Sequence, residues 1–132
     1  MNPKLRCFVR HLVAVPLGVA VARIGVMHFT NPSAFDAIVP AYLGWPRFWT
    51  LASGALEVLL GVGMVLPKTR QQSCKLFFVL VLLMTLANIN MWWNDLAFDG
   101  TRLTPTGHLV RFGAQIVLLL ALVWLARDER DV

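Results

Sequence analysis

The chain has 132 residues, of which 58% are hydrophobic and only 14% are charged, and its mean hydropathy is +0.66. These values lie outside the range of soluble domains and predict a protein that resides in a lipid bilayer. The length leaves no room for a separate soluble domain, so we expect residues 1–132 to form a single transmembrane domain. The net charge of +5 is explained by membrane topology and does not indicate nucleic-acid binding.

Four apolar stretches are long enough to cross a hydrocarbon core, which takes about 20 residues of helix. They predict transmembrane helices over residues 12–29, 48–66, 74–92 and 108–125. Because backbone polar groups in a bilayer must be satisfied within each segment, the expected fold is all-α, a four-helix membrane bundle. The first stretch also resembles a cleavable signal peptide, but apolar residues continue past Arg23 and favour a full span.

The distribution of Lys and Arg around the spans predicts the orientation, since the cytoplasmic side carries the excess. Two basic residues, Arg47 and Arg102, fall on one side. The opposite side carries eight: Lys4, Arg6, Arg10, Lys68, Arg70, Lys75, Arg127 and Arg130. We therefore expect both termini to be cytoplasmic, in a multi-pass protein of the bacterial inner membrane.

The two connections on the outer side differ in character. Asn31-Pro32 can open a short helix through Phe35, Ile38 and Val39, which Pro40 would stop. This helix would lie on the membrane surface. The connection 93–107 is polar and rich in turn residues around Asp99-Gly100, so an exposed hairpin loop is expected there.

Glu57 lies in the middle of the apolar stretch 48–66, where an unpaired charge costs about 2.5–3.5 kcal/mol on insertion scales. Other polar side chains fall in the outer half of the spans or at their outer mouth, which predicts one polar layer built by all four helices. Its candidate residues are Arg23, His28, Glu57, Asn88, Asn90, Arg111 and Gln115. Arg23 and Arg111 are the expected charge partners of Glu57, because a long guanidinium side chain can extend to a carboxylate.

Two interpretations of this layer stay open. Buried Arg-Glu and Asn-Gln contacts can act only as interhelical glue, fixing the register of the bundle. Alternatively, intramembrane ionisable residues mark a site for a ligand or for protons. No spacing of Cys, His or carboxylates predicts a metal site, and Cys7 and Cys74 are assigned no chemistry.

Several short motifs resemble those of the DoxX-like family of small four-helix bacterial membrane proteins, in the same order from about Leu17 to Leu125. The most specific is Ser53-Gly54-x-x-Glu57-x-x-x-Gly61, followed by Pro67-x-x-Arg70. Weaker matches are Gly25-Val26-Met27-His28-Phe29, Asn31-Pro32, Val39-Pro40 and Ala87-Asn88-Ile89-Asn90-Met91. Leu86 departs from the family pattern, which tends to have proline there, so a kink expected from that proline is in doubt.

The resemblance implies a loose function, because the wider group includes a subunit associated with thiosulfate:quinone oxidoreduction and partners in oxidative-stress complexes. The matched polar positions are His28, Glu57, Asn88 and Asn90. We therefore expect an accessory protein of membrane redox metabolism that binds a quinone-like ligand or docks a redox partner, alone or as a homo-oligomer. A proton-coupled transporter component and an enzyme acting on a membrane-soluble substrate are the alternatives.

Overall fold

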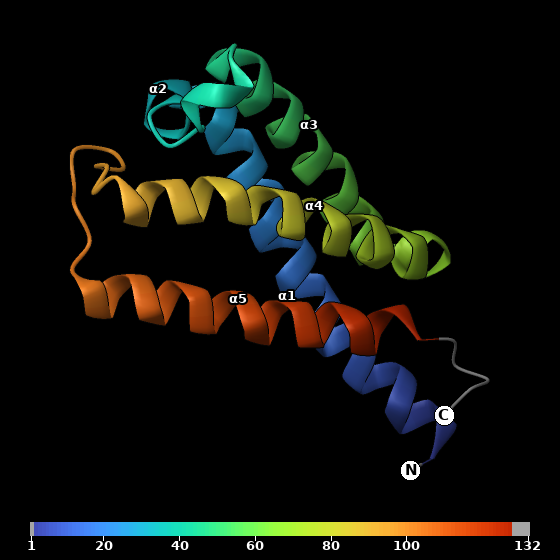
Figure 1. Cartoon of the computed structure of the whole chain (residues 1–132). Coiled ribbons are helices and arrows are strands. Elements are labelled where there is room, and N and C mark those ends of the chain that lie inside the picture. The colour runs from blue at the N-terminus through green and yellow to red at the C-terminus, as the bar shows by residue number, and fades with distance from the viewer. Residues whose placement is uncertain (1, 128–132) are drawn as a thin grey trace.

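The computed structural model describes residues 2–127 and is all-helical apart from its connections. Four long helices are apolar enough to span a membrane, which confirms the predicted class of fold. They are α1 (Pro3–Thr30), α3 (Pro46–Val65), α4 (Pro67–Trp93) and α5 (Pro105–Ala126) (Figure 1). A short helix α2 (Pro32–Asp36) and a 3-10 turn η1 (Ala41–Leu43) fill the first connection.

Each of the five α-helices begins with a proline, the residue best suited to a first helical turn because its missing N–H would have no partner there. The side chain of Asn2 caps α1, and that of Thr104 caps α5. Two helices are longer than predicted, since α1 begins at Pro3 and α4 at Pro67. Their first turns are polar and basic, so a search for apolar residues does not detect them, although the helical hydrogen bonds continue.

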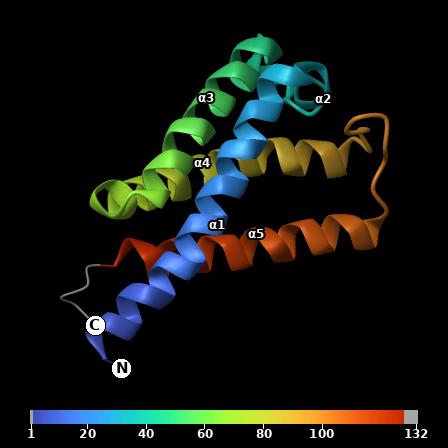
Figure 2. The ribbon, with the colours of Figure 1, turned by 180° about the vertical axis from the view of Figure 1, so that it is seen from behind.

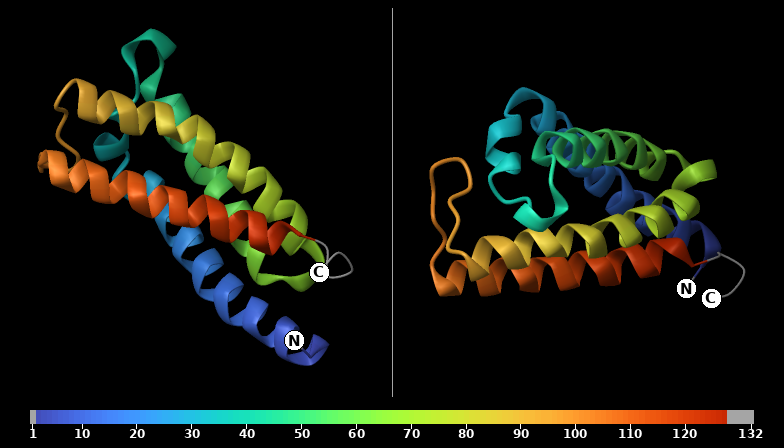
Figure 3. Two further views of the ribbon diagram at one scale, coloured as in Figure 1. Left: turned by 60° about the horizontal axis from the view of Figure 1, so that its bottom comes forward. Right: turned by 45° about the horizontal axis from the view of Figure 1, so that its top comes forward.

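The long helices form two pairs that cross each other (Figures 1 and 2). The most extensive contact is between α1 and α3, and α4 packs along α5. The start of α1, the end of α5 and the α3–α4 turn lie at one end of the molecule, whereas α2 and the α4–α5 loop lie at the other (Figure 3). We call these the terminal end and the loop end.

Glycines allow the backbones of α1 and α3 to approach closely, as small residues do in membrane helix pairs. A Cβ atom added to Gly61 would lie 2.6 Å from the carbonyl oxygen of Gly18. One added to Gly25 would lie 2.7 Å from the carbonyl oxygen of Gly54. Gly54, Glu57 and Gly61 are all buried on the face of α3 that packs against α1.

A hydrophobic core joins all four long helices toward the terminal end, with Ala14, Met64, Phe77 and Leu122 among its members. Many other large apolar side chains are exposed along the helices, such as Leu59 and Val117. Such an apolar exterior is unstable in water but suits a lipid environment.

Two arginines of the terminal end are buried, although the sequence indicated only their role in topology. Nη2 of Arg10 donates hydrogen bonds to the carbonyl oxygens of Leu125 and Arg127, each at 2.7 Å. Arg70 donates to the carbonyl oxygens of Met64 and Val65. Both guanidinium groups thus satisfy carbonyls at the C-terminal end of a helix, where a positive charge also complements the helix dipole.

The two connections contain the predicted short helix and the predicted hairpin turn, but the helix is shorter than expected. The first helix after Asn31-Pro32 ends at Asp36, earlier than Val39, and η1 follows Pro40. In the second connection, Phe98 and Thr101 form a bridge around Asp99-Gly100, both with positive φ, as a tight hairpin turn requires. Helix α4 runs without interruption through Leu86.

Candidate functional site

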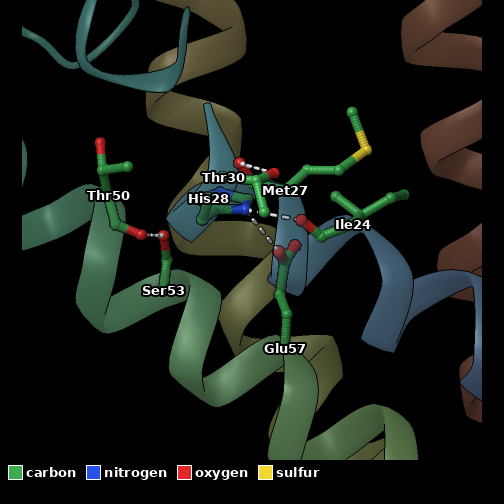
Figure 4. A network of polar contacts seen from close by, with 7 residues as sticks. All are labelled: Ile24, Met27, His28, Thr30, Thr50, Ser53 and Glu57. Atoms are coloured by element: carbon green, nitrogen blue, oxygen red, sulfur yellow. Dashed lines mark hydrogen bonds and ion pairs between the residues drawn. The ribbon is translucent and has the colours of Figure 1, made fainter. Parts of the chain in front are cut away.

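The ionisable side chains of His28 and Glu57 meet between α1 and α3, near the loop end. Nδ1 of His28 lies 3.2 Å from Oε2 of Glu57, and each side chain is only 4% exposed. Figure 4 shows the Glu57 carboxyl group directed from α3 toward the His28 ring on α1. The close approach of Gly54 to His28 leaves no room for a side chain at position 54, so the glycine contact sets the distance between the two groups.

The His28 ring lies beside a second acceptor as well as beside Glu57. Nδ1 of His28 also lies 3.0 Å from the carbonyl oxygen of Ile24, one turn earlier in α1. Because a carbonyl oxygen can only accept, this contact is a hydrogen bond in the tautomer that carries a proton on Nδ1. Oε2 of Glu57 is buried and receives no hydrogen bond within residues 2–127. Such an atom is costly in an apolar environment and calls for a partner from outside the chain.

Helix α2 covers the His28 ring from the loop end. The ring of Phe35 stacks on that of His28 with 3.6 Å between centroids, and Phe98 of the α4–α5 loop packs edge-on against Phe35. On α3, the hydroxyl group of Ser53 donates to the carbonyl oxygen of Thr50 and is thereby satisfied (Figure 4). The rings of Phe35 and Phe98 therefore form an aromatic cover over the His28 ring.

A second polar group lies between α4 and α5. The amide nitrogen of Asn88 donates to Oε1 of Gln115 at 2.8 Å, and the amide nitrogen of Gln115 donates to the hydroxyl oxygen of Thr85. Within the described part of the chain, these hydrogen bonds form a closed set that does not include Glu57. The predicted single polar layer is thus divided between the two helix pairs.

The prediction that Arg23 and Arg111 are the charge partners of Glu57 is wrong. Arg23 lies on an exposed face of α1, and Nη1 of Arg111 contacts the sulfur of Met91 at 2.8 Å. Within residues 2–127, the ion pair of Glu57 is with His28. The reason is helix rotation, since the glycine contact turns His28 toward α3 and leaves Arg23, five residues earlier, on another face. Asn90 lies elsewhere, donating to the carbonyl oxygen of Ile38 at 2.9 Å.

Sequence reasoning missed two buried polar residues near the loop end. Thr50 is 2% exposed and its hydroxyl oxygen has no hydrogen-bond partner among the described residues. His108 is 3% exposed, stacks against Trp92, and has an unpartnered Nδ1 within the same part of the chain. Each lies within one or two turns of a helix start, where polar residues are common. The sequence pattern therefore does not distinguish these buried residues from ordinary polar residues at the membrane interface.

No group of three or more His, Cys, Asp or Glu side chains is arranged to hold a metal ion within the described residues. Two shallow surface grooves lie toward the terminal end, and neither is lined by His28 or Glu57. The buried pair is therefore the strongest chemical feature of the structure, and it lies under a cover rather than in an open cleft.

Four long apolar helices and a buried ionisable pair between two of them define a small multi-pass helical membrane protein. A family model described as a domain of unknown function, DUF8561, matches residues 17–126. The chain belongs to this family. The matched residues include the His28–Glu57 pair and the Asn88–Gln115 contact. No curated protein matches the chain, and no solved structure matches it.

Proposed function

We propose that the His28–Glu57 pair binds the polar head of a membrane-soluble ligand of the quinone class, and that the protein is an accessory component of membrane redox metabolism. The observation that carries this proposal is the buried Oε2 of Glu57, which lies beside His28 and receives no hydrogen bond within residues 2–127. A ligand that offers this oxygen a hydrogen bond would remove the cost of burying it.

A quinone head suits the chemistry of the pair. Glu57 accepts a hydrogen bond as a carboxylate and donates one when protonated, so it can bind a quinol hydroxyl or a quinone carbonyl. Carboxyl and imidazole groups at 3.2 Å can pass a proton between them. Interconversion of quinone and quinol needs protons as well as electrons, and the pair can exchange the protons. The electrons would come from a partner redox protein.

The resemblance to the DoxX-like family supports the same direction, because that group includes a component of quinone-linked oxidation. The motifs that carry the resemblance include Gly25–Phe29 and Ser53–Gly61, the two segments that form the site. We further propose that the protein resides in a bacterial inner membrane with both termini in the cytoplasm, since the basic residues gather at the terminal end. The ligand site would then face the outer half of the membrane.

Binding of a short-chain quinone to the purified protein in lipid nanodiscs tests the proposal. The variant Glu57→Gln keeps the size of the side chain but loses the carboxylate, and we expect binding to weaken on the order of 10-fold or more. Ser53→Ala is the matched control, because its hydroxyl group is already satisfied by Thr50 in the same helix. Equal binding by the wild type and Glu57→Gln would exclude Glu57 from a quinone site and favour interhelical glue.

The proton contact between His28 and Glu57 also supports a second candidate, a component of a proton-coupled transporter. Reconstituted protein in liposomes would then carry out flux driven by a proton gradient, and Glu57→Gln would abolish it. If no flux occurs under imposed proton gradients and the protein binds quinone, the transporter is excluded and the quinone-binding accessory protein is supported. An enzyme acting on a membrane-soluble substrate, with His28 or Glu57 as acid or base, stays the third and least supported possibility.

A further inference from the structure

A groove between α4 and α5 near the terminal end has an apolar floor and a basic rim. Its volume is about 370 Å³. Phe78 lies on α4, while Leu122, Val123 and Ala126 lie on α5, and together they form the floor. Lys75 and Arg127 complete the lining, one from each side. Because both helices are apolar enough to span a membrane, the groove opens where lipid would lie.

Lys75 and Arg127 place exposed positive charge at the rim of the groove. Both are exposed, and neither makes an ion pair or a side-chain hydrogen bond within residues 2–127. The carbonyl oxygens at the end of α5, which could otherwise attract the side chain of Arg127, already accept hydrogen bonds from Arg10. Asp128, Glu129 and Asp131 follow in the sequence and lie outside the described residues.

The loop end shows the opposite balance. Nε of Arg47 lies 2.8 Å from Oδ2 of Asp36, and Nη1 of Arg102 lies 2.6 Å from Oδ2 of Asp95. Both basic residues of that end are thus neutralised by a carboxylate. Among the described residues, the terminal end therefore has basic side chains without an acidic one, whereas the loop end has balanced pairs.

We propose that this groove binds one anionic phospholipid, with an acyl chain along the floor and the phosphate group between Lys75 and Arg127. The apolar floor favours a lipid over a soluble anion, because only a lipid has an acyl chain to bury there. The two positive charges of the rim favour an anionic lipid over a zwitterionic one, because a zwitterionic head group has no net charge to neutralise them. Basic pockets between membrane helices bind anionic head groups by this combination.

Native mass spectrometry of the full chain with dioleoyl phosphatidylglycerol or dioleoyl phosphatidylcholine tests the proposal. We expect the first phosphatidylglycerol molecule to bind on the order of 10-fold more tightly than phosphatidylcholine. The double variant Lys75→Gln with Arg127→Gln should lose this preference. Val123→Trp, which fills the floor and keeps both charges, should lose the bound lipid as well.

The matched control is Lys4→Gln with Lys68→Gln, which removes two exposed charges from the same end but outside the groove. It should retain the preference for phosphatidylglycerol. An equal loss in the control pair would indicate attraction to the basic end as a whole and would overturn the site. Displacement of the lipid by millimolar inorganic phosphate, or a wild type without preference, would overturn it too.

Discussion

Nδ1 of His28 lies 3.2 Å from Oε2 of Glu57 and 3.0 Å from the carbonyl oxygen of Ile24, yet Oε2 receives no hydrogen bond within residues 2–127. The two residues are in contact without satisfying each other. This distinguishes the pair from the Asn88–Gln115 contact, in which both amides find partners. One polar group is thus complete in itself, while the other has an oxygen that receives no hydrogen bond among the described residues.

Glu57 should be replaceable without loss of fold. In Glu57→Leu an unsatisfied buried group gives way to an apolar one of similar volume, so the free energy of unfolding should change by less than about 1 kcal/mol or rise. His28→Ala should lower it by roughly 1–3 kcal/mol, because Phe35 loses its stacked ring and Glu57 loses its neighbour. Unfolding of both variants in detergent would measure this. If Glu57→Leu lowered the free energy of unfolding more than His28→Ala does, Oε2 of Glu57 would have to be satisfied in the native protein.

The α1–α3 contact should not tolerate a methyl group at Gly54. A Cβ atom there would overlap with His28, so Gly54→Ala should destabilise the protein by roughly 1–3 kcal/mol and weaken any binding at Glu57. Gly113→Ala is the matched control on α5, because nothing lies within 4 Å of its Cβ position. Alanine favours helix over glycine, so this control should be neutral or stabilise slightly. Thermal unfolding of the two variants compares them directly.

The hydrogen bond between Asn88 and Gln115 should show energetic coupling. We expect a double-mutant cycle with Asn88→Leu and Gln115→Leu to give about 0.6 kcal/mol, the average for such contacts in membranes. Asn88 paired with Ser53 on α3 provides a control cycle, since Ser53 bonds its own helix. If the coupling energy between Asn88 and Glu57 were as large as that between Asn88 and Gln115, the prediction of a single polar layer would be supported.

Arg10 and Arg23 lie on the same helix but should respond differently to removal. Arg10→Met leaves the carbonyl oxygens of Leu125 and Arg127 without their donor, so we expect a loss of about 1–3 kcal/mol. Arg23→Leu removes an exposed charge from an apolar span and should change the free energy of unfolding by less than about 0.5 kcal/mol. Unfolding of purified protein tests both, and a large loss in Arg23→Leu would instead indicate a partner in a homo-oligomer.

The orientation can be measured with the natural cysteines. Cys7 is exposed near the start of α1, whereas Cys74 is buried, so a maleimide should label Cys7 first. If both termini are cytoplasmic, a membrane-impermeant maleimide should label Cys7 only after the cells are opened. Thr101→Cys in a Cys7→Ser background gives the reverse control in the α4–α5 loop. Labelling of Cys7 in intact cells would contradict the proposed topology.

The sequence by itself determined the class of fold and the side chains capable of chemistry. Apolar length identified the four spans, because hydrocarbon thickness fixes the number of residues that a helix needs. Glu57 stood out because a carboxylate in such a stretch is costly. The polar starts of α1 and α4 were missed, since their helical hydrogen bonds continue where the apolar pattern has stopped.

Only the tertiary structure decided which polar side chains meet. Helix rotation and the glycine contact directed His28 to Glu57, left Arg23 exposed, and joined Asn88 to Gln115 on another helix pair. Depth along a helix can be counted in a sequence, whereas the direction of a side chain around the helix depends on which neighbour it packs against. For that reason Glu57 could be singled out from the sequence, whereas its charge partner could not.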